Sequence, residues 1–89
     1  MIEGDGLSLN NRIIENEEIG DVSNSSCVGA QFCDCTFTGR VEGCNFMDAK
    51  FFNPLLTDGA FFYGCNFVNA EGISAEIIGE KGSANNFGG

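Results

Sequence analysis

Large apolar residues recur at every fifth position through most of this chain. Blocks of five open with a small residue and carry a large apolar residue two positions later, as in residues 30–34 (AQFCD), 44–48 (CNFMD) and 65–69 (CNFVN). The same spacing continues in residues 20–24, 25–29, 35–39, 49–53, 54–58, 59–63, 70–74 and 75–79. It matches neither the period of two residues of a strand nor the period of about 3.6 residues of a helix. The pattern therefore predicts a repeating coil.

Each block predicts one side of a square coil, with its small and its large residue pointing inward. Four sides make a coil of about twenty residues, which stacks on the next at roughly 4.8 Å through parallel backbone hydrogen bonds. A four-residue link at 40–43 and an extra residue at Gly64 give spacings of 19 and 21 and restore the alignment of the coils. The expected inward columns are Ala30/Ala49/Ala70 with Phe32/Phe51/Gly72, Cys35/Pro54/Ala75 with Phe37/Leu56/Ile77, and Ser25/Cys44/Cys65 with Cys27/Phe46/Phe67.

These blocks resemble the pentapeptide-repeat family, whose pattern is a small residue, Asp or Asn, Leu or Phe, and two variable positions. Residues 44–48 and 65–69 fit this pattern well, whereas residues 54–58 and 70–74 depart from it. The resemblance covers residues 20–79. It implies an all-β fold, a short right-handed quadrilateral β-helix of about three coils.

The ends of a solenoid need cover because an open coil exposes core side chains and backbone groups. Residues 1–19 contain apolar residues without the five-residue spacing. We expect an N-terminal cap there, either a hairpin that turns at Asn10 and Asn11 or a short helix. Residues 20–79 then form the repeat domain. Residues 80–89, rich in Gly and Asn, form a loose C-terminal tail from which Phe87 folds back over the last coil.

The Phe residues divide into inward and outward positions of the predicted coil. Inward Phe residues belong to the core and are not platforms for stacking nucleobases. The expected inward set is Phe32, Phe37, Phe46, Phe51, Phe61 and Phe67. The outward set is Met47, Phe52, Phe62 and Tyr63, and forms a candidate apolar contact patch.

The chain contains five Cys and no His. It shows no signal peptide and no apolar membrane span, so we expect reduced thiols and a cytoplasmic protein. Cys33 points outward and Cys35 inward, and a zinc site needs about four ligands, so neither a metal nor a cofactor is expected. Cys44 and Cys65 stack in neighbouring coils and are expected to remain reduced.

Thirteen Asp and Glu against four Lys and Arg give a net charge of −9. This charge excludes a nucleic-acid binder that neutralises phosphates, and it disfavours an anionic membrane as partner. The acids lie on a convex coil without a cleft, so we expect no catalytic residues and no enzyme. The predicted partner-binding residues are the outward acids and a cluster near the N-terminus: Glu15, Glu17, Glu18, Asp21, Asp34, Glu42, Asp48, Asp58, Glu71 and Glu76.

A rod-like acidic body predicts a protein that occupies a basic groove and excludes DNA by competition. Acidic pentapeptide-repeat proteins act as DNA mimics on type II topoisomerases, and this chain resembles a short relation of them. In size, charge and lack of catalytic residues it is also similar to phage-encoded anti-CRISPR proteins. We therefore expect a monomer or weak homodimer that inhibits a CRISPR–Cas surveillance complex. DNA gyrase is the alternative target, and a structural repeat protein without DNA mimicry is the alternative function.

Overall fold

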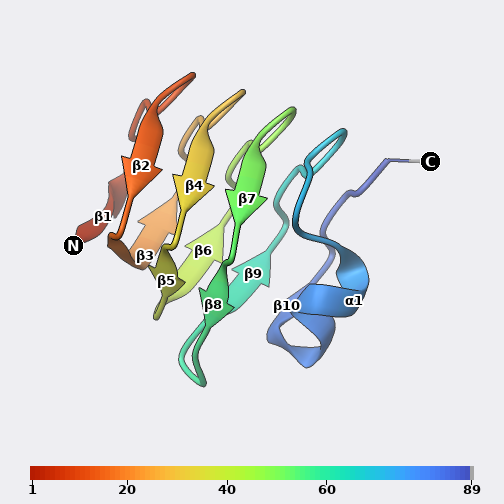
Figure 1. Ribbon diagram of the computed structural model, residues 1–89. Coiled ribbons are helices and arrows are strands. Elements are labelled where there is room, and N and C mark those ends of the chain that lie inside the picture. The colour runs from red at the N-terminus through yellow and green to blue at the C-terminus, as the bar shows by residue number, and fades with distance from the viewer. Residues whose placement is uncertain (89) are drawn as a thin grey trace.

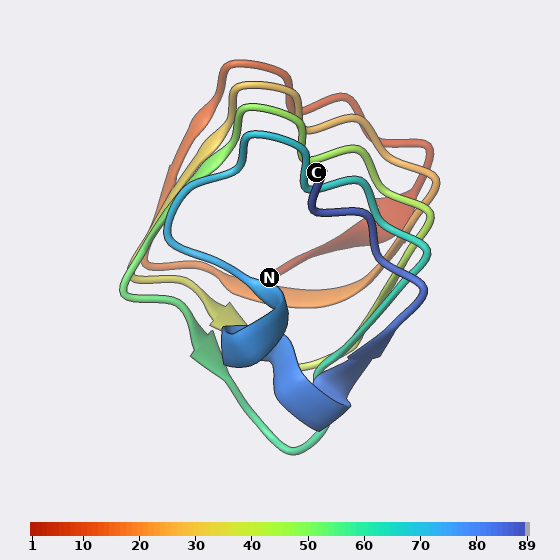
Figure 2. The same cartoon turned by 90° about the vertical axis from the view of Figure 1, so that its right-hand side faces the viewer.

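The chain winds into a parallel β-solenoid of about four turns in the computed structural model, which describes residues 1–88 (Figures 1 and 2). Residues that stack in successive turns pair in parallel, as Ile14, Phe32 and Phe51 do along one ladder. Viewed along its axis, the coil has a four-sided outline (Figure 2). The predicted short β-helix is therefore confirmed.

Four ladders form the four sides of the coil. The β2 side contains β2 (Ile13–Glu15), β4 (Gln31–Cys33) and β7 (Lys50–Phe52). The β8 side contains the start of β3 (Glu18–Ser23), β5 (Thr36–Phe37) and β8 (Leu55–Leu56). The β6 side contains the end of β1 (Ile2–Asp5), the end of β3, β6 (Arg40–Glu42), β9 (Phe61–Tyr63) and β10 (Gly82–Ser83). The fourth side is held by single bridges that link Ser8, Ser26, Asn45, Asn66 and Asn86.

Left-handed backbone conformations turn the chain at three corners of the coil. The corner residues have φ angles between 50° and 70°, which Gly, Asn and Asp adopt at the least cost. They form three columns, Gly6/Asn24/Gly43/Gly64/Ala84, Asn11/Gly29/Asp48/Asn69 and Asn16/Asp34/Asn53. This requirement accounts for the Asn, Asp or Gly that ends most of the five-residue blocks.

Stacked aromatic rings fill the interior. Phe46, Phe67 and Phe87 form one column with ring centroids 5.1 and 5.0 Å apart. Phe32 and Phe51 form a second column at 5.0 Å. The expected burial of Phe32, Phe37, Phe46, Phe51 and Phe67 is confirmed, as is the return of Phe87 over the last coil.

Phe62, and not Phe61, belongs to the core. Phe62 is fully buried and pairs with Val41, which is also fully buried and pairs with Val22 on its other side. Residues 40–43 are therefore a side of the coil and not a link, and the expected outward position of Phe62 is wrong. Phe61 is half-buried on the outer surface. The period alone cannot locate the inserted residue, because an insertion at Gly59 and one at Gly64 give the same spacing of 21 between coils.

The chain leaves the ladder at Gly72 to cover the C-terminal end. Gly72 has a φ angle of +80°, and a Cβ atom there would lie 1.8 Å from the carbonyl oxygen of Phe51, so only glycine fits. Beyond it, Ile73 and Ile78 are buried against the last turn. The inward positions expected for Gly72, Ala75 and Ile77 are therefore wrong, and all three are exposed.

A short helical segment forms the cover itself. Helix α1 (Ala75–Ile78) and the 3-10 turn η1 (Gly79–Lys81) cross the C-terminal end of the coil (Figure 2). Ser74 caps α1, because its hydroxyl oxygen accepts a hydrogen bond from the backbone N–H of Ile77 at 3.2 Å. After η1 the chain rejoins the ladders through β10 and Asn86, so the loose tail predicted for residues 80–89 is wrong up to residue 88. Residue 89 lies outside the described residues.

The N-terminal segment continues the ladders, and the expected hairpin or short helix is wrong. Ile2 of β1 pairs with Ile19, and Ile14 of β2 pairs with Phe32, in both cases in parallel. These pairs are 17 and 18 residues apart, so the first turn is shorter than the others and its repeat does not show in the sequence. Leu7 and Leu9 pack partly buried against the core from this turn.

The solenoid is nearly as wide as it is long. Its principal extents are 29, 26 and 24 Å. About four turns at the spacing of parallel strands, roughly 4.8 Å, give a stack no longer than the coil is broad. The rod-like body expected from the repeat is therefore wrong for a solenoid of this length.

Candidate functional site

The predicted acidic residues lie around the whole circumference of the coil, and the structure brings only some of them together. Glu15, Glu17 and Glu18 follow one another at the corner between the β2 and β8 sides, and Asp34 occupies the same corner one turn later. Asp21 and Glu42 lie on the β6 side. The remaining four are separate from these groups: Asp48 at another corner, Asp58 before β9, Glu71 at the end of the β2 side and Glu76 in α1.

The corner group is held by weak contacts with neighbouring turns. The Glu17 carboxylate lies 3.5 Å from the N-terminal amine. The hydroxyl of Thr38 donates to Glu18 at 3.3 Å, and the amide of Asn53 donates to Asp34 at 3.3 Å. Most of these acids are exposed on a convex edge, so the group presents negative charge without enclosing a ligand.

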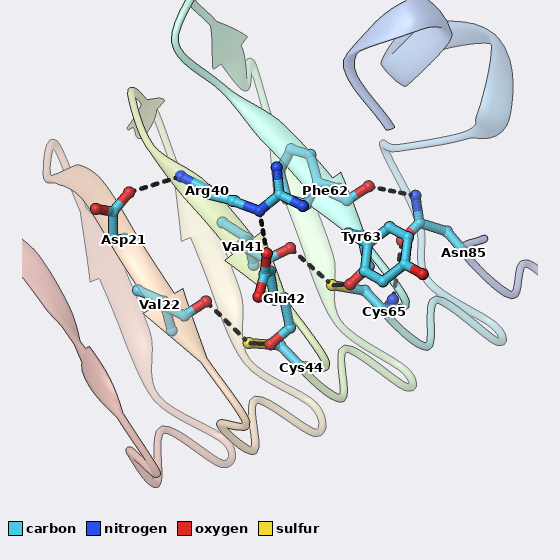
Figure 3. A network of polar contacts seen from close by, with 10 residues as sticks. All are labelled: Asp21, Val22, Arg40, Val41, Glu42, Cys44, Phe62, Tyr63, Cys65 and Asn85. Atoms are coloured by element: carbon cyan, nitrogen blue, oxygen red, sulfur yellow. Dashed lines mark hydrogen bonds and ion pairs between the residues drawn. The ribbon is translucent and has the colours of Figure 1, made fainter. Parts of the chain in front are cut away.

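The β6 side carries an open hollow of about 430 Å³. The hollow is lined by Gly4, Asp5, Asp21, Val22, Ser23, Arg40 and Glu42. Figure 3 draws four of its lining residues, Asp21, Val22, Arg40 and Glu42. Sequence reasoning missed Asp5, although Asp5 stands 18 residues before Ser23, which stands 19 residues before Glu42 in the same column. The first turn hides this relation because its spacing is short.

Two carboxylates of the hollow are oriented by neutral donors. Asp5 accepts hydrogen bonds from the Ser23 hydroxyl at 2.6 Å and from the Asn24 amide at 3.0 Å, and these bonds lower the pKa of the Asp5 carboxyl. Asp21 accepts a hydrogen bond from the backbone N–H of Arg40 at 2.8 Å (Figure 3). Both carboxylates are exposed and keep acceptor capacity for a further donor.

Arg40 fixes a positive charge beside these carboxylates. Its Nε pairs with the Glu42 carboxylate. Its guanidinium carbon lies 5.0 Å from the ring centroid of Phe61 and 5.9 Å from that of Tyr63, within the range of a cation–π contact. The β6 side thus already holds one guanidinium between a carboxylate and two aromatic rings.

Ion pairs neutralise only part of the predicted acidic set. Besides Arg40 with Glu42, Lys50 lies 4.0 Å from Glu71 and Lys81 lies 3.7 Å from Asp58. These pairs are exposed, where such contacts contribute little to stability. Within residues 1–88, the predicted acids without an ion pair are Glu15, Glu18, Asp21, Asp34, Asp48 and Glu76.

The thiols belong to the core. All five are free, and only Cys33 is partly exposed. Cys35 and Cys65 each donate to a backbone carbonyl of the preceding turn at 3.4 Å. Burial raises the pKa of the Cys27 thiol to about 12, and the neighbouring Cys44 thiol together with burial raises that of Cys65. The protonated, enclosed thiols of Cys27 and Cys65 are therefore poor nucleophiles and poor metal ligands.

The part of the chain that the structure describes contains no group of three or more His, Cys, Asp or Glu side chains placed to hold a metal ion. Over the same residues, no helix has the length and apolar character needed to cross a bilayer.

The candidate apolar contact patch predicted from the sequence differs in the structure. Phe52 and Tyr63 are about half exposed, as expected, but Phe62 is buried, so the expected patch loses a member.

The chain was also compared with known proteins. No protein-family model, no curated protein and no solved structure matches it. The likeness of its blocks to pentapeptide repeats therefore stays a prediction, and so does the general similarity to anti-CRISPR proteins. What the structure itself establishes is a short parallel β-solenoid with an acidic surface.

Proposed function

We propose that this protein binds the basic groove of a nucleic-acid-binding protein in place of DNA and acts as a stoichiometric inhibitor. The observation that carries the proposal is the excess of exposed carboxylates over cations on a rigid ladder. Three of the four basic side chains are paired with acids of the chain itself. The net charge of −9 is therefore presented to the solvent with few cations to oppose a basic partner.

The charge density of the solenoid supports competition with DNA. Nine net charges along the longest extent of 29 Å correspond to one charge per about 3.2 Å. Duplex DNA carries one charge per about 1.7 Å of its axis. The protein thus offers about half the charge density of the duplex, enough to engage the same Lys and Arg side chains over a short stretch.

The distribution of the acids favours a partner that surrounds the coil. Carboxylates occur on the β2 side, on the β6 side, at two corners and in α1. A flat basic surface would meet only one of these groups, whereas a channel would meet several. A CRISPR–Cas surveillance complex holds nucleic acid in such a positively charged channel and is the first target to test. DNA gyrase is the second.

The direct test is displacement of a fluorescently labelled duplex from each purified target by increasing amounts of the protein. We expect displacement to be complete near stoichiometric amounts, to weaken as salt rises, and to be reversed by excess unlabelled duplex. Binding to a target that is indifferent to both salt and DNA would contradict the proposal and favour a structural repeat protein instead.

Charge reversal supplies a second test. Replacing Glu15, Glu17, Glu18 and Asp21 together by Lys reverses four exposed charges, and we expect displacement to be lost. A second variant reverses Asp34, one turn further along the same corner, together with Asp48 and Asp58 on other parts of the coil. If displacement survives in both variants, carboxylates do not mediate binding and the proposal fails.

A further inference from the structure

Within residues 1–88, the N-terminal end of the solenoid has no helical cover like the one that α1 and η1 form at the other end (Figure 1). The first residues continue the ladders as β1 and β2 instead. Ile2, Leu7 and Leu9 of this first turn are only partly buried. Met1 and Ile13 are exposed. This end of the coil therefore presents apolar side chains and a strand edge to the solvent.

The exposed edge belongs to β2, which pairs on one side only, in a sheet of the order β2, β4, β7. The carbonyl of Arg12 and the N–H of Asn16 bond to β4 at 2.8 and 2.9 Å. In a parallel ladder the backbone groups of alternate residues face opposite sides, so the N–H and C=O of Ile14 also face β4. Those of Ile13 and Glu15 face the open end. The edge thus offers two N–H and two C=O groups in a fixed arrangement.

This arrangement is complementary to itself. When two β2 strands lie antiparallel with Ile14 of one copy opposite Ile14 of the other, Ile13 of each copy lies opposite Glu15 of the other. Opposed residues of a hydrogen-bonded antiparallel pair exchange both of their N–H···O=C bonds. This single register uses all the free backbone groups of both edges, and it has the twofold symmetry of a closed dimer.

The side chains of β2 also match in this register. The two Glu15 carboxylates are not directly opposite each other, which avoids the unfavourable pairing of like charges across strands. Arg12 is exposed and is the basic side chain that forms no ion pair within residues 1–88. It lies one position along from Ile13, and so beside Glu15 of the second copy. Two symmetric Arg–Glu contacts result, and they flank the exposed Ile13 side chains.

The end of the coil is large enough for a specific contact. Its two smaller extents, 24 and 26 Å, bound a face of roughly 600 Å² (24 × 26 Å). Two such faces cover about 1,200 Å², the lower limit for specific and stable interfaces. The net charge of −9 on each copy opposes the contact. Together these quantities favour a weak dimer that salt strengthens.

We propose that the N-terminal end of the solenoid binds the same end of a second copy, through antiparallel pairing of the two β2 edges about a twofold axis at Ile14. The helical cover of the C-terminal end stops the association at two copies, so the solenoids do not stack into a fibre. The dimer goes beyond the proposed function and does not depend on it, because the outward sides of both coils remain accessible.

Sedimentation velocity and amide hydrogen exchange test the proposal on the unchanged chain. As protein concentration rises, we expect a species with the mass of two chains, and more of it at high salt. Exchange at the amides of Ile13 and Glu15 should slow over the same series, whereas the amide of Ile14 should not change, because it is bonded in both states. The mass of one chain at every concentration would overturn the proposal. A dimer whose Ile13 and Glu15 amides stay unprotected would also overturn it, since another surface would then make the contact.

A charge exchange tests the register. Arg12→Glu places like charges together at both symmetric contacts and should weaken the dimer by about tenfold. Arg12→Glu combined with Glu15→Arg restores opposite charges and should recover most of the affinity. Both side chains are exposed, so the fold should tolerate these changes. The control is Lys50→Glu, an exposed position in β7 with the same change in net charge, and it should leave the dimer nearly unchanged. Equal weakening by Arg12→Glu and Lys50→Glu, or no recovery in the double variant, would show that this register is wrong.

Discussion

Asp5 shows how a single surface residue is positioned by the repeat. Its column continues through Ser23, Glu42 and Tyr63 in successive turns, so the Ser23 side chain of the next turn lies beside it. The Ser23 hydroxyl and the Asn24 amide both donate to it. These hydrogen bonds stabilise the ionised carboxylate and lower the pKa of the Asp5 carboxyl.

A pH prediction follows from this contact. The hydrogen bonds from Ser23 and then Asn24 lower the pKa of Asp5 below its ordinary value of 3.8. A lowered pKa in the folded state means that Asp5 stabilises the fold above pH 3.8 and that this contribution is lost as the pH falls through the folded pKa. NMR titration of the side-chain carboxyl should give a midpoint below 3.8, and Ser23→Ala should move it upward. A midpoint at or above 3.8 in the unchanged chain would contradict the contact.

Gly72 is the residue at which the repeat ends. We expect Gly72→Ala to lower the free energy of unfolding by about 2 kcal/mol or more, because the new Cβ atom would meet the Phe51 carbonyl oxygen and the backbone conformation is left-handed. Gly64→Ala is the matched control, since Gly64 has a φ angle of +64° and nothing within 4 Å of the added atom. Its cost should be about 1 kcal/mol. Urea denaturation measures both, and equal costs would show that the close approach to Phe51 is not rigid.

At the scale of elements, pairing in the ladder decides which side chains are inward, and the sequence reveals this pairing only in part. The five-residue spacing predicted the central turns because small and large residues alternate there without interruption. It failed at β9, where two Phe residues adjoin and the period fits either one. It failed in β1 and β2 because the first turn is short, and after Gly72 because the chain departs from the ladder. The hollow went unpredicted for the same reason, since Asp5 lies in the short turn.

Substitutions in β9 test the register of this strand. Phe62 is fully enclosed by neighbouring rings, including Phe37 at 5.3 Å, so Phe62→Ala should cost about 3–5 kcal/mol of unfolding free energy. Phe61 is half-buried under Arg40, so Phe61→Ala should cost about 1 kcal/mol. Thermal or urea denaturation distinguishes them. The reverse order would restore the register that the five-residue period suggests and would place Phe61 in the core.

At the scale of the whole molecule, the same charges oppose folding and favour association. Thirteen carboxylates on a body of 29 × 26 × 24 Å repel one another, and the four basic side chains relieve this repulsion only locally. The net charge of −9 also exceeds what solubility requires. A net charge of this size, kept at a cost in stability, is consistent with a surface selected for a basic partner.

Salt should therefore act on the fold and on the complex in opposite directions. Raising sodium chloride from about 0.05 M to about 0.5 M shortens the range of charge–charge interactions from above 10 Å to a few Å. The free energy of unfolding should rise over this interval because repulsion among the carboxylates is screened. Affinity for the basic partner should fall over the same interval because the attraction is screened too. Urea denaturation and duplex displacement in the same buffers measure the two effects. If stability and affinity fell together, weaker binding at high salt would reflect a less stable fold, and the carboxylates would not be the groups that the partner recognises.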